Sequence, residues 1–162
     1  MKTTKLSILA ILAISVMITS INAESVNKSF WTDQLNKNVS EITLNTGESK
    51  TVRLFAEIPD NNTLKAYSVV IYYDDTIIEL ATSASPNSQM KPKMVSSDSP
   101  GTVIVNSFDV NGVTGGSTAI ADIVLTGIKA GSNSCSVLFT AFGEDADKQF
   151  LPKSSSLQVN VK

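Results

Sequence analysis

The sequence predicts an all-β protein, an antiparallel β-sandwich of two facing sheets. Three observations favour this class. From residue 39 onward, short runs alternate apolar and polar side chains, as strands with one buried face do. Breaks rich in Gly, Pro, Asn, Asp and Ser separate these runs, and no run shows an apolar stripe of helical period. Seven or more short strands with no helices between them indicate a sandwich, not a helix-covered parallel sheet.

The expected strands recur along the chain at short intervals. Within KTVRLFAEIP every second residue from Val52 to Ile58 is apolar, which places those side chains on one face. The expected strands are KTVRLFAEIP, YSVVIYY, TIIELA, GTVIVNSF, AIADIVLTGI, CSVLFTAF and SLQVNV. The expected breaks are NTGES, PDNN, SASPNS, SSDSPG, DVNGVTGGS, KAGSN and GEDADK.

Residues 1–23 are typical of a secretory signal peptide. Lys2 and Lys5 give a basic start, an apolar run of 13 residues follows at 6–18, and the small residue Ala23 precedes the expected cut. The run is shorter than the roughly 20 apolar residues of a spanning helix, so no membrane span is expected after cleavage. An uncleaved anchor is the alternative. The mature chain is expected to be secreted, extracellular or periplasmic.

The remaining chain divides into a polar segment and one domain. Residues 24–38, ESVNKSFWTDQLNKN, are interpreted as a linker or short docking segment, and residues 39–162 as the sandwich domain. Cleavage removes Lys2 and Lys5, so 11 of the 13 basic side chains remain against 15 acidic ones, a net charge of −4. Because the lysines do not cluster either, nucleic-acid binding is not expected.

The composition argues against catalysis. The chain has no histidine, which excludes Ser-His-Asp and Cys-His nucleophile systems and His-ligated zinc. Cys135 is the only cysteine, so no intramolecular disulfide forms, and within SCSVLF it is expected to pack as a small apolar strand residue. We therefore expect no enzyme, no catalytic residue and no cofactor.

The stretch AYSVVIYY, residues 66–73, is rather apolar on both faces. Alternation places Tyr67, Val69, Ile71 and Tyr73 on one face and Ala66, Ser68, Val70 and Tyr72 on the other. The outer face of a sandwich strand is normally polar. A second apolar face therefore indicates a surface that is either covered or recruits a partner.

The order of motifs resembles that of the cohesin family, over about residues 42–161. The motifs are Gly47-Glu48 before a Val-rich strand, Tyr73-Asp74 with Ile78-Glu79, Gly101-Thr102, Gly115-Gly116 and a terminal Val159-x-Val161. The resemblance implies a jelly roll of about nine strands in which Tyr67, Val69, Ile71 and Tyr73 enter the core. Asp74 and Asp75 suit the turn after that strand, where family members usually have Pro in place of Asp75.

The resemblance also implies a function, protein docking, with a dockerin-like protein module as the partner. The expected partner-binding residues are Ala66, Ser68, Val70, Tyr72, Asn106, Phe108, Asp109, Asn111 and Gly112. Their apolar centre and polar rim match the make-up of a protein interface. Many cohesins carry Asn and Asp where this chain has Ala66 and Ser68. In the alternative reading, Val70 and Phe108 pack beneath residues 83–100 or 24–38.

Carboxylates gather in two places, at Asp74, Asp75 and Glu79, and within residues 144–147. EF-hand spacing fails from Asp109, because Thr114 and Ile120 stand where Gly and Glu are needed, and fails likewise from Asp145. We interpret these acids as solvated turn residues and expect no metal ligands, with a structural calcium at one loop as the alternative.

Direct polysaccharide binding is the second functional hypothesis, because cohesin sandwiches resemble several carbohydrate-binding modules. Sugar platforms need exposed coplanar Trp and Tyr rings. Trp31 lies outside the matched region and two of the three tyrosines are assigned to the core, which leaves only Tyr72 to stack. An envelope or adhesion component is a further alternative.

Overall fold

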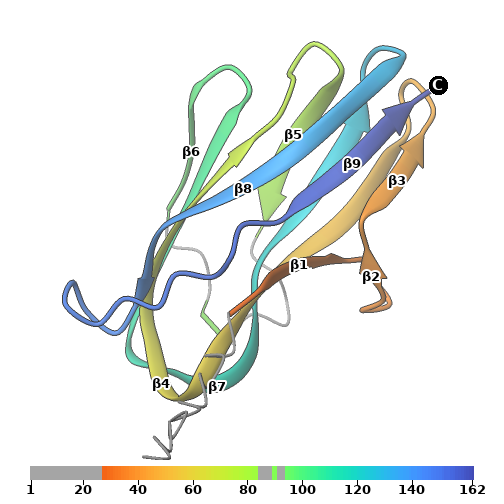
Figure 1. The fold of residues 1–162 in the computed structure, drawn as a ribbon. Coiled ribbons are helices and arrows are strands. Elements are labelled where there is room, and N and C mark those ends of the chain that lie inside the picture. Colours follow the sequence, from red (N-terminus) through yellow and green to blue (C-terminus); the bar gives the residue numbers. More distant parts are fainter. Residues whose placement is uncertain (1–26, 84–88, 91–93) are drawn as a thin grey trace, which may run out of the picture.

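The computed structural model describes residues 27–83, 89–90 and 94–162, and in these residues it is all β (Figure 1). The expected leader and its cut after Ala23 lie outside the described residues. The strands are β1 (Ser29–Thr32), β2 (Asn38–Val39), β3 (Glu41–Leu44), β4 (Ser49–Tyr72), β5 (Ile78–Ser83), β6 (Met94–Ser99), β7 (Thr102–Gly127), β8 (Gly131–Gly143) and β9 (Ser156–Val161).

Two long strands, β4 and β7, build both layers of the sandwich. Residues 49–58 of β4 pair with residues 116–126 of β7, and residues 63–72 pair with residues 102–114. β1 and β5 flank the first set of pairs, whereas β8 and β6 flank the second. Both long strands bend at the lower end of Figure 1 and pass there from one layer to the other. The all-β sandwich is therefore confirmed.

The last strand closes the molecule. β9 pairs antiparallel with the first half of β8 and parallel with β3, which makes the sheet mixed where a purely antiparallel one was predicted. The predicted break in PDNN is the bend of β4, where Asn61 has a φ of 66° and the register shifts between Ile58 and Thr63. The pairing with β7 is interrupted at residues 59–62 and resumes at Thr63, so one strand passes through a site predicted to end it.

Four strands of the described residues lie outside the expected ones: β1, β2, β3 and β6. Residues 24–38 were expected to precede the domain, but Ser29–Thr32 pair with β4 as β1. Trp31 is buried, and Phe30 stacks on Phe55 at a centroid distance of 5.3 Å. The domain therefore begins before residue 39. β6 was also missed, because its sequence MVSSDS lacks the alternation of an apolar strand.

The core confirms the predicted faces of residues 66–73. Tyr67, Val69 and Ile71 are buried, and Tyr73 is half-buried and packs against the core.

Cys135 is buried as expected, and its burial raises the pKa of the thiol to about 12. Among the described residues, no helix is long and apolar enough to span a membrane.

The Tyr67 hydroxyl makes stability depend on alkaline pH. It donates a hydrogen bond to the Ile120 carbonyl at 3.0 Å, and burial raises its pKa well above the usual value of 10. An unfolded tyrosine loses its proton near pH 10, whereas the folded one keeps it. The free energy of unfolding should therefore fall by about 1.4 kcal/mol per pH unit above about pH 10 through this group alone.

Urea unfolding of the wild type and of Tyr67→Phe between pH 9 and pH 11 measures this effect. Tyr67→Phe removes the titrating hydroxyl and should have a shallower pH slope, while other tyrosines and lysines contribute equally to both curves. Equal slopes for the two proteins would contradict the prediction.

A buried ion pair joins β4 and β7 in the layer where residues 49–58 pair with residues 116–126, on the outer side of that layer. Arg53 Nε lies 2.6 Å from Asp122 Oδ1, and a second guanidinium nitrogen donates to Oδ2 at 3.1 Å. Arg53 is 6% and Asp122 7% exposed, and the hydrogen bond to Asp122 raises the pKa of Arg53. The loop after β1 covers the pair, because Asn36 Oδ1 accepts from Arg53 at 3.1 Å. Because the two charges are paired and hydrogen-bonded, Arg53 and Asp122 can be buried together.

Candidate docking face

The candidate site is the outer face of four neighbouring strands, β8, β4, β7 and β6, which we call the docking face. Along β4 it carries Ala66, Ser68, Val70 and Tyr72, because the intervening residues point into the core. The pairing register places Ala66 opposite Phe108 and Ser68 opposite Asn106. Six of the nine sequence-predicted residues thus lie together on this face.

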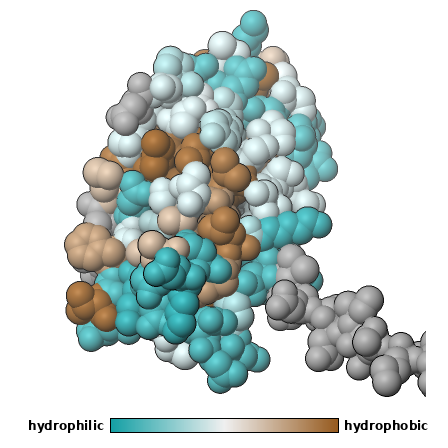
Figure 2. Space-filling model, turned by 60° about the vertical axis from the view of Figure 1, so that its left-hand side comes forward, coloured by the Kyte–Doolittle hydropathy of each residue, from teal (hydrophilic) through white to brown (hydrophobic). Residues whose placement is uncertain are grey.

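An apolar row crosses the centre of the docking face. Val70 pairs with Leu138 of β8 on one side and with Ile104 of β7 on the other, so three aliphatic side chains lie side by side on three strands. Val70 is only 9% exposed, because its neighbours flank it on both sides. Figure 2 shows apolar residues gathered in the middle of this side of the molecule, with hydrophilic residues around them.

Three exposed side chains, two aromatic rings and one methionine, extend this apolar row. Tyr72 is 46% and Phe108 64% exposed, and Met94 of β6 pairs with Asn106 at the edge of the face. In the alternative reading Val70 and Phe108 pack beneath residues 83–100 or 24–38; Val70 is buried and Phe108 is 64% exposed, and residues 24–26, 84–88 and 91–93 of those segments lie outside the described residues. Sequence reasoning missed Leu138, Ile104 and Met94. The alternation of CSVLFTAF was the available signal for Leu138, but only the register aligns it with Val70.

Neutral polar groups border the apolar row. Ser136 pairs with Tyr72, and Thr140 Oγ1 lies 2.9 Å from the Ser68 hydroxyl. Asn106 lies on the other side of Ser68, across the β4–β7 ladder. These side chains donate and accept hydrogen bonds without carrying charge, so they suit the rim of an interface.

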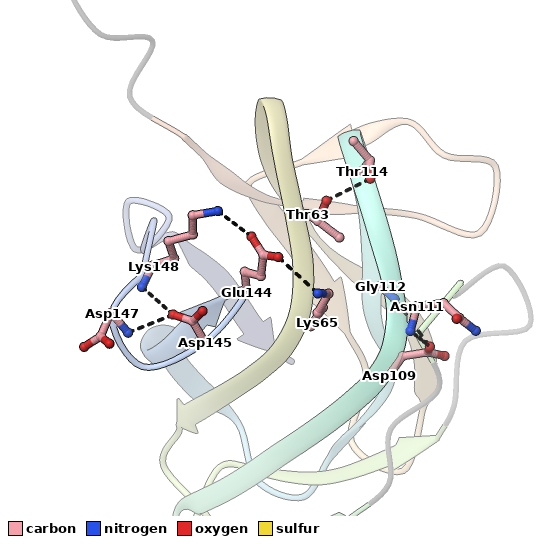
Figure 3. Close-up of polar contacts among 10 residues, drawn as sticks. All are labelled: Thr63, Lys65, Asp109, Asn111, Gly112, Thr114, Glu144, Asp145, Asp147 and Lys148. Carbon is pink, nitrogen blue, oxygen red and sulfur yellow. Dashed lines mark hydrogen bonds and ion pairs between the residues drawn. The ribbon is translucent and has the colours of Figure 1, made fainter.

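The last three predicted residues form a projection at the end of the face. Asp109 was expected to share a face with Asn106 and Phe108, but its carboxylate Oδ1 accepts from the backbone nitrogens of Asn111 at 2.9 Å and Gly112 at 3.4 Å (Figure 3). It stabilises its own turn and is thereby withdrawn from the row. Asn111 is exposed beside it.

Charged groups lie beyond this end of the face. Lys65 Nζ donates to Glu144 Oε1 at 3.0 Å, and Lys148 Nζ donates to Oε2 at 2.8 Å, as Figure 3 shows. Both lysines lower the pKa of Glu144, with the hydrogen bond from Lys148 the larger cause. Two lysines thus share one carboxylate, and all three side chains are partly exposed to solvent.

Asp145 and Asp74 are turn residues as predicted, whereas Glu79 lies within β5, paired with Thr126, and not in a turn. Asp145 Oδ1 accepts from the backbone nitrogens of Asp147 and Lys148, and Asp74 Oδ1 accepts from Thr76. The contacts with Thr76 lower the pKa of Asp74. In the described part of the chain no three His, Cys, Asp or Glu side chains are grouped to hold a metal ion.

Two cohesin-like motifs meet at the opposite end of the face. Tyr73 N donates to Gly101 O at 2.9 Å, and a Cβ on Gly101 would lie 2.5 Å from the Tyr73 carbonyl oxygen. Gly101 also has a φ of 69°. The residue before Thr102 must therefore be glycine so that the two strand ends can approach.

Comparison of whole structures identifies the architecture. The sixth cohesin of scaffoldin B from Acetivibrio cellulolyticus, solved in complex with a Cel5 dockerin mutant, superposes with a TM-score of 0.63. Identity is 18%, over 76% of this chain and 95% of the other. The chain has the cohesin fold.

Other cohesins agree with this assignment. The cohesin module of a family 33 glycoside hydrolase from Clostridium perfringens has a TM-score of 0.62 at 14% identity and covers 85% of this chain and 98% of its own. A non-cellulosomal cohesin from Archaeoglobus fulgidus has a TM-score of 0.58 at 12% identity, over 83% and 91%. No family model and no curated protein matches the sequence. The cohesin fold of this chain is thus shown by structure at low sequence identity.

Proposed function

We propose that the protein is a secreted, non-catalytic docking module that binds a dockerin-like helical module through the docking face. The observation that carries this proposal is the row Leu138, Val70 and Ile104 at the centre of the docking face, where Leu138 and the neighbouring Tyr72 are exposed. Solved cohesins of the same fold include several in complex with dockerins. The expected partner-binding residues on β4 and β7 keep that role in the proposal.

The spacing of the row suits a helix lying across the strands. Neighbouring strands are about 4.8 Å apart, so the three aliphatic side chains repeat at about that interval. Residues three or four apart on a helix advance along its axis by about 4.5–6 Å. A helix crossing the strands can therefore place one apolar side chain over each strand.

The contacts of the partner should be mainly apolar. The docking-face residues named above are aliphatic, aromatic, thioether or neutral polar side chains, whereas the charged groups Lys65, Glu144 and Lys148 lie beyond the end of the face. Ala66 and Ser68 offer fewer hydrogen bonds than the Asn and Asp of many cohesins. Tyr72, exposed and beside the row, is the expected anchor.

Immobilised mature protein incubated with proteins secreted by its host tests the function. The captured partner should contain a dockerin module with calcium loops, and a chelator should release it because such loops fold around the metal. Capture of proteins without a dockerin would overturn the proposal. Retardation in soluble-glycan gels with no protein partner would support the carbohydrate-binding alternative.

Tyr72→Ala tests the face itself. We expect it to weaken partner binding by roughly 10-fold or more, the effect of losing an interface anchor of about 1.4–2 kcal/mol, while the melting temperature changes little. Leu35→Ala is the matched control, because it removes an exposed apolar side chain from the loop between β1 and β2, outside the docking face. Calorimetric titration that finds equal losses for both variants would place the binding surface elsewhere.

A further inference from the structure

The projection at the end of the docking face is an unusually large bulge in the β4–β7 ladder. Phe108 pairs with Ala66, and the next described pair on this side of the bend is Val113 with Leu64. Four residues of β7, 109–112, therefore stand opposite the single residue Lys65 of β4. A common bulge adds one residue, whereas this one releases four residues from the ladder.

Asn111 and Gly112 occupy this bulge as the only Asn-Gly pair in the chain. Asn111 is exposed, and Gly112 has a φ of 69°. A Cβ at Gly112 would lie 2.6 Å from Thr63 Cγ2 and 2.7 Å from Leu64 O, so this position has to be glycine. Because glycine has no side chain, residue 112 itself does not hinder the approach of the Asn111 side chain to the Gly112 nitrogen.

The hydrogen bond from the Gly112 nitrogen to a side chain is long. Its hydrogen-bond acceptor, Asp109 Oδ1, is 3.4 Å away, beyond the usual range for N–H to O, whereas the same oxygen binds the Asn111 nitrogen at 2.9 Å. Figure 3 shows the three residues together on β7. A carboxylate therefore stands beside the N–H group without immobilising it.

We propose that Asn111 is a site of spontaneous deamidation. The Gly112 nitrogen attacks Asn111 Cγ, a C–N bond forms to close a five-membered succinimide, and the side-chain nitrogen leaves as ammonia. The N–H proton is lost to solvent or to the adjacent Asp109 carboxylate, which passes it on to the leaving group or water. Water then adds to one of the two ring carbonyls and opens the ring to aspartate or isoaspartate. The reaction needs no oxidant and no co-reactant other than water.

The product differs from the native residue in charge and, for isoaspartate, in backbone length. It places a second carboxylate next to Asp109, beside the exposed apolar residues Val110 and Phe108. If the proposed function holds, ageing of the secreted protein would alter the rim of its docking face. The modification itself is measured without any partner, so its failure and the failure of docking are separate results.

Peptide mapping by mass spectrometry tests the proposal. The purified chain is incubated at mildly alkaline pH, both native and unfolded in urea, and sampled over days. We expect the peptide with Asn111 to gain the mass of an amide-to-acid exchange in both states, and an isoaspartyl methyltransferase to label it. Asn61 is the internal control, because it is exposed and has a positive φ but is followed by Asn62.

Asn111→Gln is the matched variant, since the longer side chain disfavours ring closure. It should keep the wild-type melting temperature and lose the labelling. Conversion in urea without conversion of the native protein would show that the bulge locks the peptide and would overturn the proposal. Equal conversion at Asn61, or none at Asn111 in either state, would overturn it as well.

Discussion

Val69→Asp should abolish soluble folding of this protein. Val69 lies near the end of β4, between β7 and β8, and is fully buried, with Val105 of β7 and Phe139 of β8 as its cross-strand neighbours. The carboxylate would enter an apolar interior without a partner, and the cost of burying it is of the order of the whole stability of a domain, about 5–15 kcal/mol. Soluble yield and the circular dichroism spectrum measure the outcome.

Ser68→Asp is the matched control, one residue earlier on the same strand. Its side chain lies on the docking face, so the new carboxylate remains hydrated and the protein should stay soluble. A soluble Val69→Asp together with an insoluble Ser68→Asp would mean that the two faces of β4 are exchanged.

Asp122→Ala should cause the second-largest loss, through the ion pair that joins β4 and β7. The substitution leaves the Arg53 guanidinium buried, with the hydrogen bond to Asn36 Oδ1 still in place. Breaking a buried pair costs about 3–5 kcal/mol. For a domain of this size that corresponds to a decrease of roughly 10–15 °C in Tm.

The double variant Arg53→Met with Asp122→Leu separates charge burial from packing. Replacing both charges with apolar side chains of similar volume is often neutral or stabilising. We therefore expect the double variant to recover most of the Tm lost in Asp122→Ala. If the double variant is as unstable as the single one, packing rather than an unpaired charge accounts for the loss.

The sequence predicted which residues of β4 lie on each face, but not which residues of the adjacent strands lie beside them. Tyr67, Val69 and Ile71 could be assigned to one side because side chains alternate along any strand. Leu138 and Ile104 are far from Val70 in the chain, and only pairing brings them into one row. The same holds for Arg53 and Asp122, which look like two separate surface charges until the strands pair.

The N-terminal boundary shows another limit of sequence patterns. Ser29–Thr32 have the sequence SFWT, in which two apolar residues stand side by side, so they lack the alternation of a strand with one buried face, and the polar residues on either side make the segment resemble a linker. The structure assigns them to the sandwich because Trp31 is buried and Phe30 stacks on Phe55. These contacts depend on β4, which follows later in the chain.

Asp109 illustrates how local chemistry decides within the candidate site. Its place after Phe108 suggested a role on the docking face, yet a short carboxylate binds nearby backbone nitrogens when the chain turns. The sequence predicted the candidate region, whereas the bulge decided which of its side chains lie on the docking face.

By itself, the sequence determined the all-β class, the core-facing residues of β4 and the turns that follow its strands. These are local properties, set by alternation and by residues that favour particular backbone angles. Only the tertiary structure decided the apolar row, the buried ion pair and the four-residue bulge. Each depends on the register between strands distant in the chain, and register is set by how all the strands pack together.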